Sequence, residues 1–461
     1  MSGLDASFYL LEDENTPFHV ASVIVFEGPA PSYGDLVRLI VSKLPEVPRY
    51  RQRVRPIPLH MGRPVWADDP HFQVLYHVRH TAVPAPGNDE QLRNLAGRVL
   101  GQRLDPAKPL WEIWLVEGLQ DGRWALICKV HHSMVDGVAG MDLATLIFDL
   151  TPDAAPPAET EPWDPAPEPS SLYLLADAMR HNVLEPVRGL RDLNWLVRQA
   201  GRGREVGGDV VGFAAGLARS VGRLMQPSHG GLNGPIGPHR RWCWATAQLD
   251  EVKTIRKALG GTVNDVVLAA VTRGFRDLLE ARGELTPGAV VRSAVPVSLR
   301  TSGQRGELNN KVSAMFVNLP CGEADPYKRL VLLRDQMDDL KKSRQEVSGK
   351  GLTRIADTAV APALMALGTA APVRLPNAIV QTVTTNVPGP QFPIYALGRQ
   401  AIEFHPYVPI TGGIQVSTAI FSYLGRLHFG LTGDFDGMPD LTTLADGIGN
   451  GIQELLKLAE T

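Results

Sequence analysis

Apolar and polar residues alternate along the first part of the chain in a way that predicts short strands and a few helices. The alternation over residues 18–28 predicts a strand that ends at the Gly28-Pro29 pair. The apolar runs 112–117 and 124–130 flank an Asp121-Gly122 pair, which predicts two strands joined by a turn. We also expect a helix over 33–44 with Ser32 as its N-cap, strands near 65–66 and 71–78, and helices over 89–100 and 140–150.

The middle of the chain differs in composition from both flanks. Residues 151–170 are rich in proline and acidic residues, which indicates an extended connector. Residues 171–225 have mostly helical spacing, and a loop rich in glycine and proline follows over 226–239. We therefore divide the chain into an N-terminal lobe (1–150), a proline-rich linker with a helical connector (151–240) and a C-terminal lobe (241–461).

Strand and helix patterns alternate again after this connector. A long helix is expected over 263–281, and a charged amphipathic helix over 327–346. The other expected elements are strands at 242–249, 290–297, 311–319, 379–385, 414–423 and 426–432, and helices at 249–259 and 442–458. Strands mixed with helices on both sides of the connector predict an α/β protein with two halves.

Size and composition are those of an ordinary globular protein. The 461 residues suggest two or three domains, and the net charge of −3 provides no basic field for nucleic acid. Cys128, Cys243 and Cys321 are far apart and odd in number, so we expect no disulfide framework and a reducing cytosol. The N-terminus shows no secretory signal, and no apolar run is long enough to predict a spanning helix.

The segment HHSMVDG at residues 131–137 carries the clearest chemical signal. It follows directly on the apolar run 124–130, so His131 and His132 point to opposite faces if the strand continues through them. Asp136 lies four residues after His132, and Gly137 allows the backbone to turn there. This spacing favours a single oriented base over a metal site, because no third or fourth ligand lies at a recognisable spacing.

Further motifs occur in an order that resembles a known family. They are LDASFYLLEDENTPFHV at 4–20, PLWE at 109–112, LNGPIGPHRR at 232–241, Asn264-Asp265, PVSLR at 296–300 and NVPGP at 386–390. HHxxxDG alone is typical of the CoA-dependent acyltransferase superfamily, which includes chloramphenicol acetyltransferase and condensation domains. The whole set resembles the bacterial wax ester synthase/diacylglycerol acyltransferase family over nearly the whole chain, and its actinobacterial triacylglycerol synthase branch most closely.

The resemblance implies both a fold and a reaction. The fold has two lobes, each a mixed β-sheet flanked by helices, with a tunnel between the lobes through which acyl-CoA and acceptor enter from opposite sides. The reaction is transfer of a fatty acyl group from CoA to the hydroxyl of diacylglycerol or of a long-chain alcohol. Acyl-CoA is then a co-substrate, and neither a cofactor nor a metal is expected.

The reaction requires a base. An alcohol that attacks a thioester must lose its proton, and a neutral imidazole with a reference pKa of about 6.5 suits this step. In keeping with the family, His132 is the candidate base. His131, the other histidine of the motif, is expected to be structural by bonding a backbone group. No G-x-S-x-G motif occurs, so direct attack is expected, with Ser133 as the alternative nucleophile.

Asp136 fits an orienting role better than that of a second base. Its carboxylate could bond the ring N–H of the active histidine, as in hydrolase triads. The superfamily resemblance implies instead a salt bridge to an arginine that shapes the motif loop. Arg300 of PVSLR is the natural partner, and we predict an Asp136–Arg300 pair across the lobes.

The remaining motif residues are candidates for substrate binding, each with a structural alternative. Trp111 forms either a wall of the acyl pocket or part of the core. Asn264-Asp265 lies near a helix start, where both residues are good caps, or else holds an active-site helix in place. Thr384, Thr385 or Asn386 could supply the oxyanion donor, although turn chemistry alone explains the asparagine before Pro-Gly.

Two other functions keep this sequence pattern but change the activity. One is a condensation-type acyltransferase that acts on carrier-protein thioesters. The other is a non-catalytic lipid-binding protein on the same scaffold, against which the intact HHSMVDG argues. Because the expected substrates are apolar, we predict a cytoplasmic protein that binds peripherally to the inner membrane face or to lipid inclusions.

Overall fold

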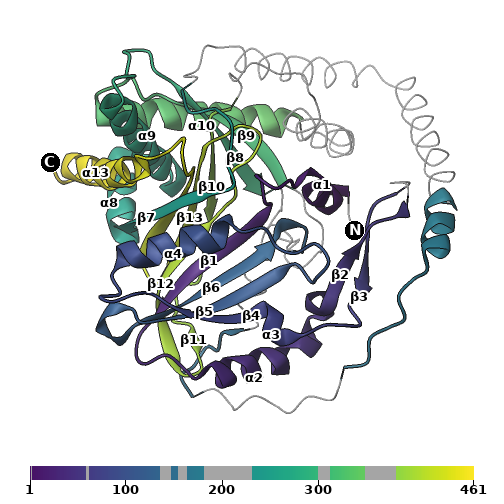
Figure 1. Cartoon of the computed structure of the whole chain (residues 1–461). Coiled ribbons are helices and arrows are strands. Elements are labelled where there is room, and N and C mark those ends of the chain that lie inside the picture. The colour runs from purple at the N-terminus through teal and green to yellow at the C-terminus, as the bar shows by residue number, and fades with distance from the viewer. Residues whose placement is uncertain are drawn as a thin grey trace, which may run out of the picture.

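Two six-stranded sheets form the framework of the protein in the computed structural model (Figure 1). The structure describes residues 1, 3–58, 62–134, 147–153, 163–180, 231–298, 312–347 and 380–461. The first sheet has the order β11 (Tyr395–Ala396), β12 (Arg399–Tyr407), β1 (His19–Phe26), β6 (Trp124–His131), β5 (Trp111–Glu117) and β4 (Val78–Ala82). Its strands pair antiparallel except β4 with β5, so the sheet is mixed.

Alternation of side chains sends the residues of β6 into two different cores. Leu126, Cys128 and Val130 face a core that includes Leu36 and Ile40 of α2 (Tyr33–Lys43). The intervening Ala125 and Ile127 face α4 (Asp89–Gly101). Ser32 caps α2 as predicted, since its side chain accepts the Asp35 N–H at 3.1 Å.

The second sheet carries the helices of the C-terminal half on its face (Figure 1). Its order is β7 (Arg240–Gln248), β14 (Arg426–Asp434), β13 (Val416–Tyr423), β10 (Thr382–Val387), β8 (Val291–Ser298) and β9 (Val312–Leu319). β13 and β8 each pair parallel with β10, and the other pairs are antiparallel. The helices are α8 (Leu249–Leu259), α9 (Val263–Ala281), α10 (Pro326–Val347) and α13 (Leu441–Glu460).

Small residues allow α9 and α13 to pack closely. A Cβ atom on Gly447 would lie 2.7 Å from the Cα atom of Gly274, and one on Gly274 would lie 2.6 Å from the carbonyl oxygen of Leu444. Both distances are shorter than side-chain contacts permit, so each glycine is required by the approach of the two helices. Both helices contribute buried apolar residues to the core of this lobe.

The two sheets confirm the predicted two-lobed α/β fold with a mixed sheet in each lobe. They are not separated in sequence, however. β11 and β12 come from residues beyond 241, which we assign to the C-terminal lobe, yet β12 pairs with β1 in the first sheet. A strand from the C-terminal part of the chain thus completes the sheet of the N-terminal lobe. The boundaries at 150 and 240 remain predictions.

Several local predictions were wrong or incomplete. The predicted strand over 71–78 is a turn of helix, α3 (Val74–His77), followed by β4. Four elements are not predicted from the sequence. They are α1 (Gly3–Leu11), β11, β12 and β2 (Gln52–Arg55), the last of which pairs with β3 (Val65–Asp68). Short 3₁₀ turns lie at η1 (Leu44–Glu46), η2 (Pro48–Arg51) and η4 (Gln120–Gly122).

The described part of the proline-rich connector lies against the β2–β3 pair. Residues 163–170 have no regular structure, and residues 171–180 are helical. Glu168 pairs with Arg53 at 2.9 Å and with Arg55 at 2.7 Å. The predictions for 140–146, 154–162 and 181–230 fall outside the described residues. Within the described ranges, every helix is too short or too polar to cross a bilayer.

Candidate active site

The two histidines of the motif lie where β6 ends. His131 is the last residue of the strand, and its N–H donates to the carbonyl of Leu110 at 2.9 Å. His132 begins the 3₁₀ turn η5 (His132–Met134), and its N–H donates to the carbonyl of Phe18 at 2.8 Å. The backbone is thus held from two neighbouring segments at the point where the side chains separate.

His131 is fully buried and bound by its own turn. Its Nδ1 atom accepts the backbone N–H of Ser133 at 3.1 Å and lies 2.7 Å from the Ser133 hydroxyl. Because Nδ1 accepts, the ring proton is on Nε2, which lies 3.6 Å from Oε2 of Glu12. Burial lowers the pKa of His131 to about 3, with the neighbouring His132 and Arg103 adding to the effect. The His131 ring is therefore neutral, and its Nδ1 atom is occupied by Ser133.

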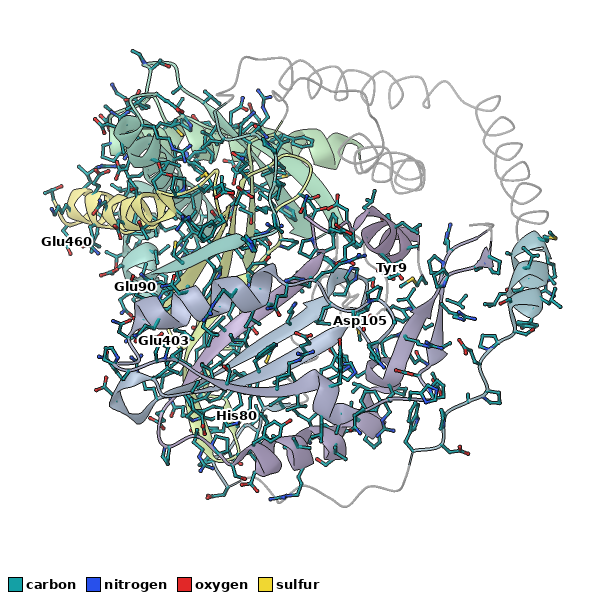
Figure 2. The ribbon with its side chains drawn as sticks, in the orientation of Figure 1. Tyr9, His80, Glu90, Asp105, Glu403 and Glu460 are labelled. Carbon is teal, nitrogen blue, oxygen red and sulfur yellow. The ribbon has the colours of Figure 1, made fainter. Side chains whose placement is uncertain are left out.

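Glu12 forms the other side of the His131 environment. Its side chain is 1% exposed, its Oε2 lies 3.2 Å from Nε of Arg103, and its Oε1 accepts the Phe18 N–H at 3.2 Å. Burial raises the pKa of this carboxyl, and the Arg103 guanidinium opposes the rise. Tyr9 of α1 meets the His131 ring edge-on at 6.1 Å, and Figure 2 shows it on that helix.

Lys129 lies two residues earlier on the same face of β6. Its side chain is fully buried, and Nζ donates to the carbonyls of Val99 at 3.2 Å and of Gln102. Glu112 lies 3.7 Å away. Burial lowers the pKa of Lys129 to about 8, although Glu112 opposes it. The ammonium thus caps the last turn of α4 from inside the lobe.

His132 has a different environment from His131. Its ring is half-buried and stacks on Phe8 of α1, with ring centroids 4.1 Å apart and planes at 28°. Its Nδ1 atom is buried and makes no hydrogen bond to another described residue. Burial lowers the pKa of His132, and the negative charge of Asp5 opposes this. A neutral, partly accessible imidazole is the form that a general base requires.

The rest of the motif loop is not within the described residues. Asp136, Gly137 and Arg300 all lie outside them, so the Asp136–Arg300 pair and the turn at Gly137 stay predictions. Within the described ranges, no three histidine, cysteine or acidic side chains come together as metal ligands.

The predicted residues of the second lobe meet at the start of α9. Asp265 closes a capping box with Thr262, whose N–H and hydroxyl both donate to Oδ2 at 2.8 Å. Asn264 accepts from Nδ2 of Asn386 at 3.3 Å, which joins the helix start to the end of β10. The geometry of Asp265 is that of a cap.

The three oxyanion candidates differ in accessibility. Thr384 is 1% exposed, and its hydroxyl accepts from Ser293 at 2.8 Å. Thr385 and Asn386 are half-buried. Since an oxyanion donor must reach the substrate, these two are better placed than Thr384 to take that role.

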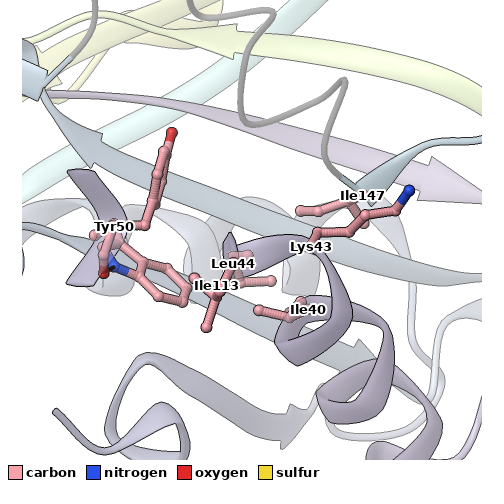
Figure 3. A pocket seen from close by; sticks show the side chains of 7 residues that line it. Ile40, Lys43, Leu44, Tyr50, Ile113 and Ile147 are labelled. Atoms are coloured by element: carbon pink, nitrogen blue, oxygen red, sulfur yellow. Dashed lines mark hydrogen bonds between the residues drawn. The ribbon is translucent and has the colours of Figure 1, made fainter. Parts of the chain in front are cut away.

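Trp111 lies in the core of the first lobe. It is 1% exposed, its Nε1–H donates to the Tyr50 carbonyl at 2.8 Å, and its ring stacks on His77 at 4.6 Å. It also lines a small cavity, shown in Figure 3, with Ile40, Lys43, Leu44, Tyr50, Ile113 and Ile147. The cavity has room for about 10 Å³, enough for one water molecule and far too little for an acyl chain.

Sequence reasoning missed the contribution of α1. Phe8 and Glu12 contact the two histidines, whereas the sequence indicates only a family motif in this opening segment. The available signal was helical spacing, since Ala6, Tyr9 and Leu10 recur at intervals of three and four residues. Arg103, just after α4, carried no signal of its own.

Comparison with solved structures defines the class of protein. A wax ester synthase/diacylglycerol acyltransferase from Marinobacter aquaeolei VT8 superimposes with a TM-score of 0.72 and 25% identity, covering 100% of this chain and 99% of that chain. A variant starter condensation domain of rhizomide synthetase RzmA, in complex with C8-CoA, has the same fold at a TM-score of 0.58 and 13% identity, covering 100% and 94%. This chain has the two-lobed fold of both proteins, and the first of them is an acyltransferase.

Sequence comparison narrows the class to a family. The wax ester synthase/diacylglycerol acyltransferase catalytic domain matches residues 1–267, and the WS/DGAT C-terminal domain matches residues 308–456. A Mycobacterium tuberculosis protein named a probable diacylglycerol O-acyltransferase, tgs1, is 32% identical over 100% of this chain and 96% of its own. Another, tgs2, is 30% identical over 98% and 97%. The chain belongs to the wax ester synthase/diacylglycerol acyltransferase family, as its motifs indicated, and is an O-acyltransferase.

Proposed function

We propose that this protein transfers a long-chain acyl group from acyl-CoA to the hydroxyl of diacylglycerol, with His132 as general base. The observation that carries the proposal is the contrast between the two motif histidines. His131 is fully buried and its Nδ1 accepts the Ser133 N–H, whereas the His132 ring is half-buried and its Nδ1 makes no hydrogen bond to another described residue. The names of the mycobacterial relatives favour diacylglycerol as the acceptor.

The chemistry is a direct displacement at the thioester carbonyl. As the acceptor oxygen bonds to the acyl carbon, its proton passes to His132. The buried Nδ1 leaves Nε2 as the atom that takes this proton. The tetrahedral intermediate then collapses, the carbon–sulfur bond breaks, and the imidazolium returns the proton to the departing CoA sulfur. No acyl-enzyme forms, so Ser133 has no covalent part.

The second lobe contributes to this step in the proposal. Thr385 or Asn386 donates to the oxyanion, a role favoured by their partial exposure at the end of β10. Asp136 and Arg300 pair to hold the motif loop, and Gly137 permits its turn. Trp111 acts on the acyl chain only if the core around it opens, because the adjoining cavity is too small.

Apolar substrates require contact with a lipid phase. We propose that the protein binds peripherally to the inner membrane face or to lipid inclusions, and accepts long-chain alcohols as secondary substrates through the same tunnel between the lobes. Flotation with anionic and zwitterionic vesicles tests the binding, which is rejected if all protein stays in the soluble fraction.

A purified-enzyme assay tests the reaction. Palmitoyl-CoA is supplied with dioleoylglycerol, hexadecanol or no acceptor, and CoA release and the ester product are both measured. The proposal predicts triacylglycerol with dioleoylglycerol and less ester with hexadecanol. CoA release only when an acylated carrier protein is present would favour the condensation-type alternative. Lipid binding without CoA release from any acceptor would favour a non-catalytic binding protein.

A further inference from the structure

Helix α1 and the residue that follows it lie beside the histidine pair. Asp5 and Phe8 are three positions apart on one side of α1, and Glu12 comes directly after the helix ends at Leu11. Glu12 approaches His131 at 3.6 Å, and Phe8 stacks on His132 at 4.1 Å. Asp5 lies one turn before Phe8 on α1, its Oδ1 atom is buried, and its charge acts on His132.

We propose that Phe8 and Asp5 are positioning residues for His132. The Phe8 ring fixes the plane of the imidazole, and the Asp5 carboxylate stabilises the imidazolium that forms when His132 takes the acceptor proton. This inference rests on the proposed role of His132 as the base. It assigns a part in acyl transfer to the N-terminal helix, outside the HHSMVDG segment.

The argument for Phe8 is geometric. A half-buried ring whose Nδ1 makes no hydrogen bond to another described residue has no polar contact there to fix its rotation. Parallel stacking at 4.1 Å and 28° supplies a restraint through dispersion instead. Phe8 is itself braced by Phe18, whose ring centroid lies 5.9 Å away and whose carbonyl binds the His132 N–H.

The argument for Asp5 is electrostatic. Proton transfer creates a positive charge on a ring that burial keeps neutral, so the step needs a nearby negative charge. Asp5 on α1 supplies it, while His131 on β6 is neutral above about pH 3 and supplies none. Glu12 is committed to Arg103 at 3.2 Å, so its charge is already balanced. The proton moves only between the acceptor, His132 and the CoA sulfur.

The experiment measures the pH dependence of kcat/KM and kcat with palmitoyl-CoA and dioleoylglycerol in Asp5→Asn. Because the Asp5 charge opposes the fall in the His132 pKa, the acidic limb of the profile should move to lower pH. The plateau kcat should fall about 10- to 100-fold, less than the ~10⁴-fold lost when a carboxylate bonded directly to a catalytic histidine is neutralised. The KM for palmitoyl-CoA should stay within about twofold of wild type, since uniform binding is retained.

Matched variants separate the charge from the fold. Glu14→Gln removes an exposed negative charge from the segment after α1 and should leave the profile unchanged. Phe8→Tyr keeps the stack and should retain activity, whereas Phe8→Leu should lower kcat without moving the acidic limb. If Asp5→Asn does not fold, Asp5→Glu provides the test. This variant keeps the negative charge but moves the carboxylate, so the acidic limb should stay at the wild-type pH and kcat should fall.

Two outcomes would overturn the inference. In the first, the Asp5→Asn variant has the acidic limb and the kcat of wild type. In the second, its plateau kcat falls but the acidic limb of the pH profile does not move. Either result would mean that Asp5 does not act on the charge of His132. A failure of the proposed function itself looks different, because His132→Ala would then retain turnover. Loss of activity in His132→Ala with a wild-type Asp5→Asn rejects only the role of Asp5, and wild-type kcat in Phe8→Leu would reject that of Phe8.

Discussion

Ser133 holds the ring of His131 through two of its own atoms, the backbone N–H at 3.1 Å and the hydroxyl at 2.7 Å from Nδ1. This relationship closes a small turn at the point where β6 gives way to η5. His131 therefore has a structural role, because its Nδ1 atom is bound by the backbone and hydroxyl of Ser133. The neighbouring His132 stacks on Phe8, and its ring is only half-buried.

Ser133→Ala separates a structural serine from a nucleophilic one. The substitution removes one of the two donors to His131 and should lower the free energy of unfolding by about 1 kcal/mol. Turnover should persist at a reduced level, because direct attack needs no serine. Urea unfolding and CoA release measure the two effects. An unchanged stability with complete loss of activity would contradict direct attack and favour an acyl-serine.

Lys129 should make the stability depend on alkaline pH. Its pKa is about 8 in the folded protein and 10.5 in the unfolded chain, so between these values the unfolded state binds more protons. The free energy of unfolding therefore rises as pH increases from 8 to 10.5. The full effect is ~3 kcal/mol, from about 1.4 kcal/mol for each pH unit between the two pKa values.

Variants of two lysines isolate this effect. Urea unfolding of wild type and Lys129→Met at pH 7.5, 8.5 and 9.5 should show a rise with pH in wild type that is smaller in the variant. Lys253→Met, which removes an ammonium that is 54% exposed, should retain the wild-type dependence. Parallel pH dependence in wild type and Lys129→Met would show that Lys129 is not perturbed.

Thr262→Ala tests whether the start of α9 serves folding or catalysis. The hydroxyl donates to Asp265 and accepts its N–H, so its loss should lower the free energy of unfolding by about 1 kcal/mol. Because the capping box lies in the helix start and Asp265 is 1% exposed, KM for both substrates should not change. Thermal unfolding and steady-state kinetics are compared with those of Thr443→Ala, which changes a half-buried threonine in the first turn of α13. A wild-type Tm with a raised KM would support the active-site role instead.

Trp111→Phe distinguishes a core residue from a wall of the acyl pocket. The variant loses the bond to the Tyr50 carbonyl and enlarges the cavity beside Ile113, which should destabilise the protein by roughly 2–3 kcal/mol. The ratio of kcat/KM for C12, C16 and C18 acyl-CoA should remain that of wild type. Trp66→Phe, at a half-buried tryptophan of β3, is the control. A change in chain-length preference would support the alternative that Trp111 forms a wall of the acyl pocket.

Elements with both periodicity and end signals could be predicted closely from sequence. The predicted helix 263–281 coincides with α9, because Thr262 and Asp265 mark its start and apolar spacing continues to its end. The run 71–78 was misread because a short apolar stretch fits a strand or a helix equally. In the structure, Gln73 accepts the Leu75 N–H at 3.4 Å and His77 donates to the Trp111 carbonyl at 2.8 Å, which stabilise a helical turn.

Features that depend on contacts between distant segments could not be predicted. β12 joins the first sheet by pairing with β1, some 380 residues earlier, and no local pattern specifies that partner. In the same way, the motif identified His132, but only the folded chain brings Phe8 against it. The local sequence therefore identifies the candidate base, whereas its neighbours are set by the tertiary structure.

The most direct test compares His132→Ala with His131→Ala in one assay of CoA release from palmitoyl-CoA with dioleoylglycerol, alongside thermal unfolding of both. His132→Ala should keep a near-wild-type Tm and lose at least 10²-fold in kcat, the lower bound for a general base. His131→Ala should be less stable, because Ser133 loses its acceptor, and should retain partial turnover. Equal loss of kcat in both variants, or turnover that persists in His132→Ala, would contradict His132 as the base.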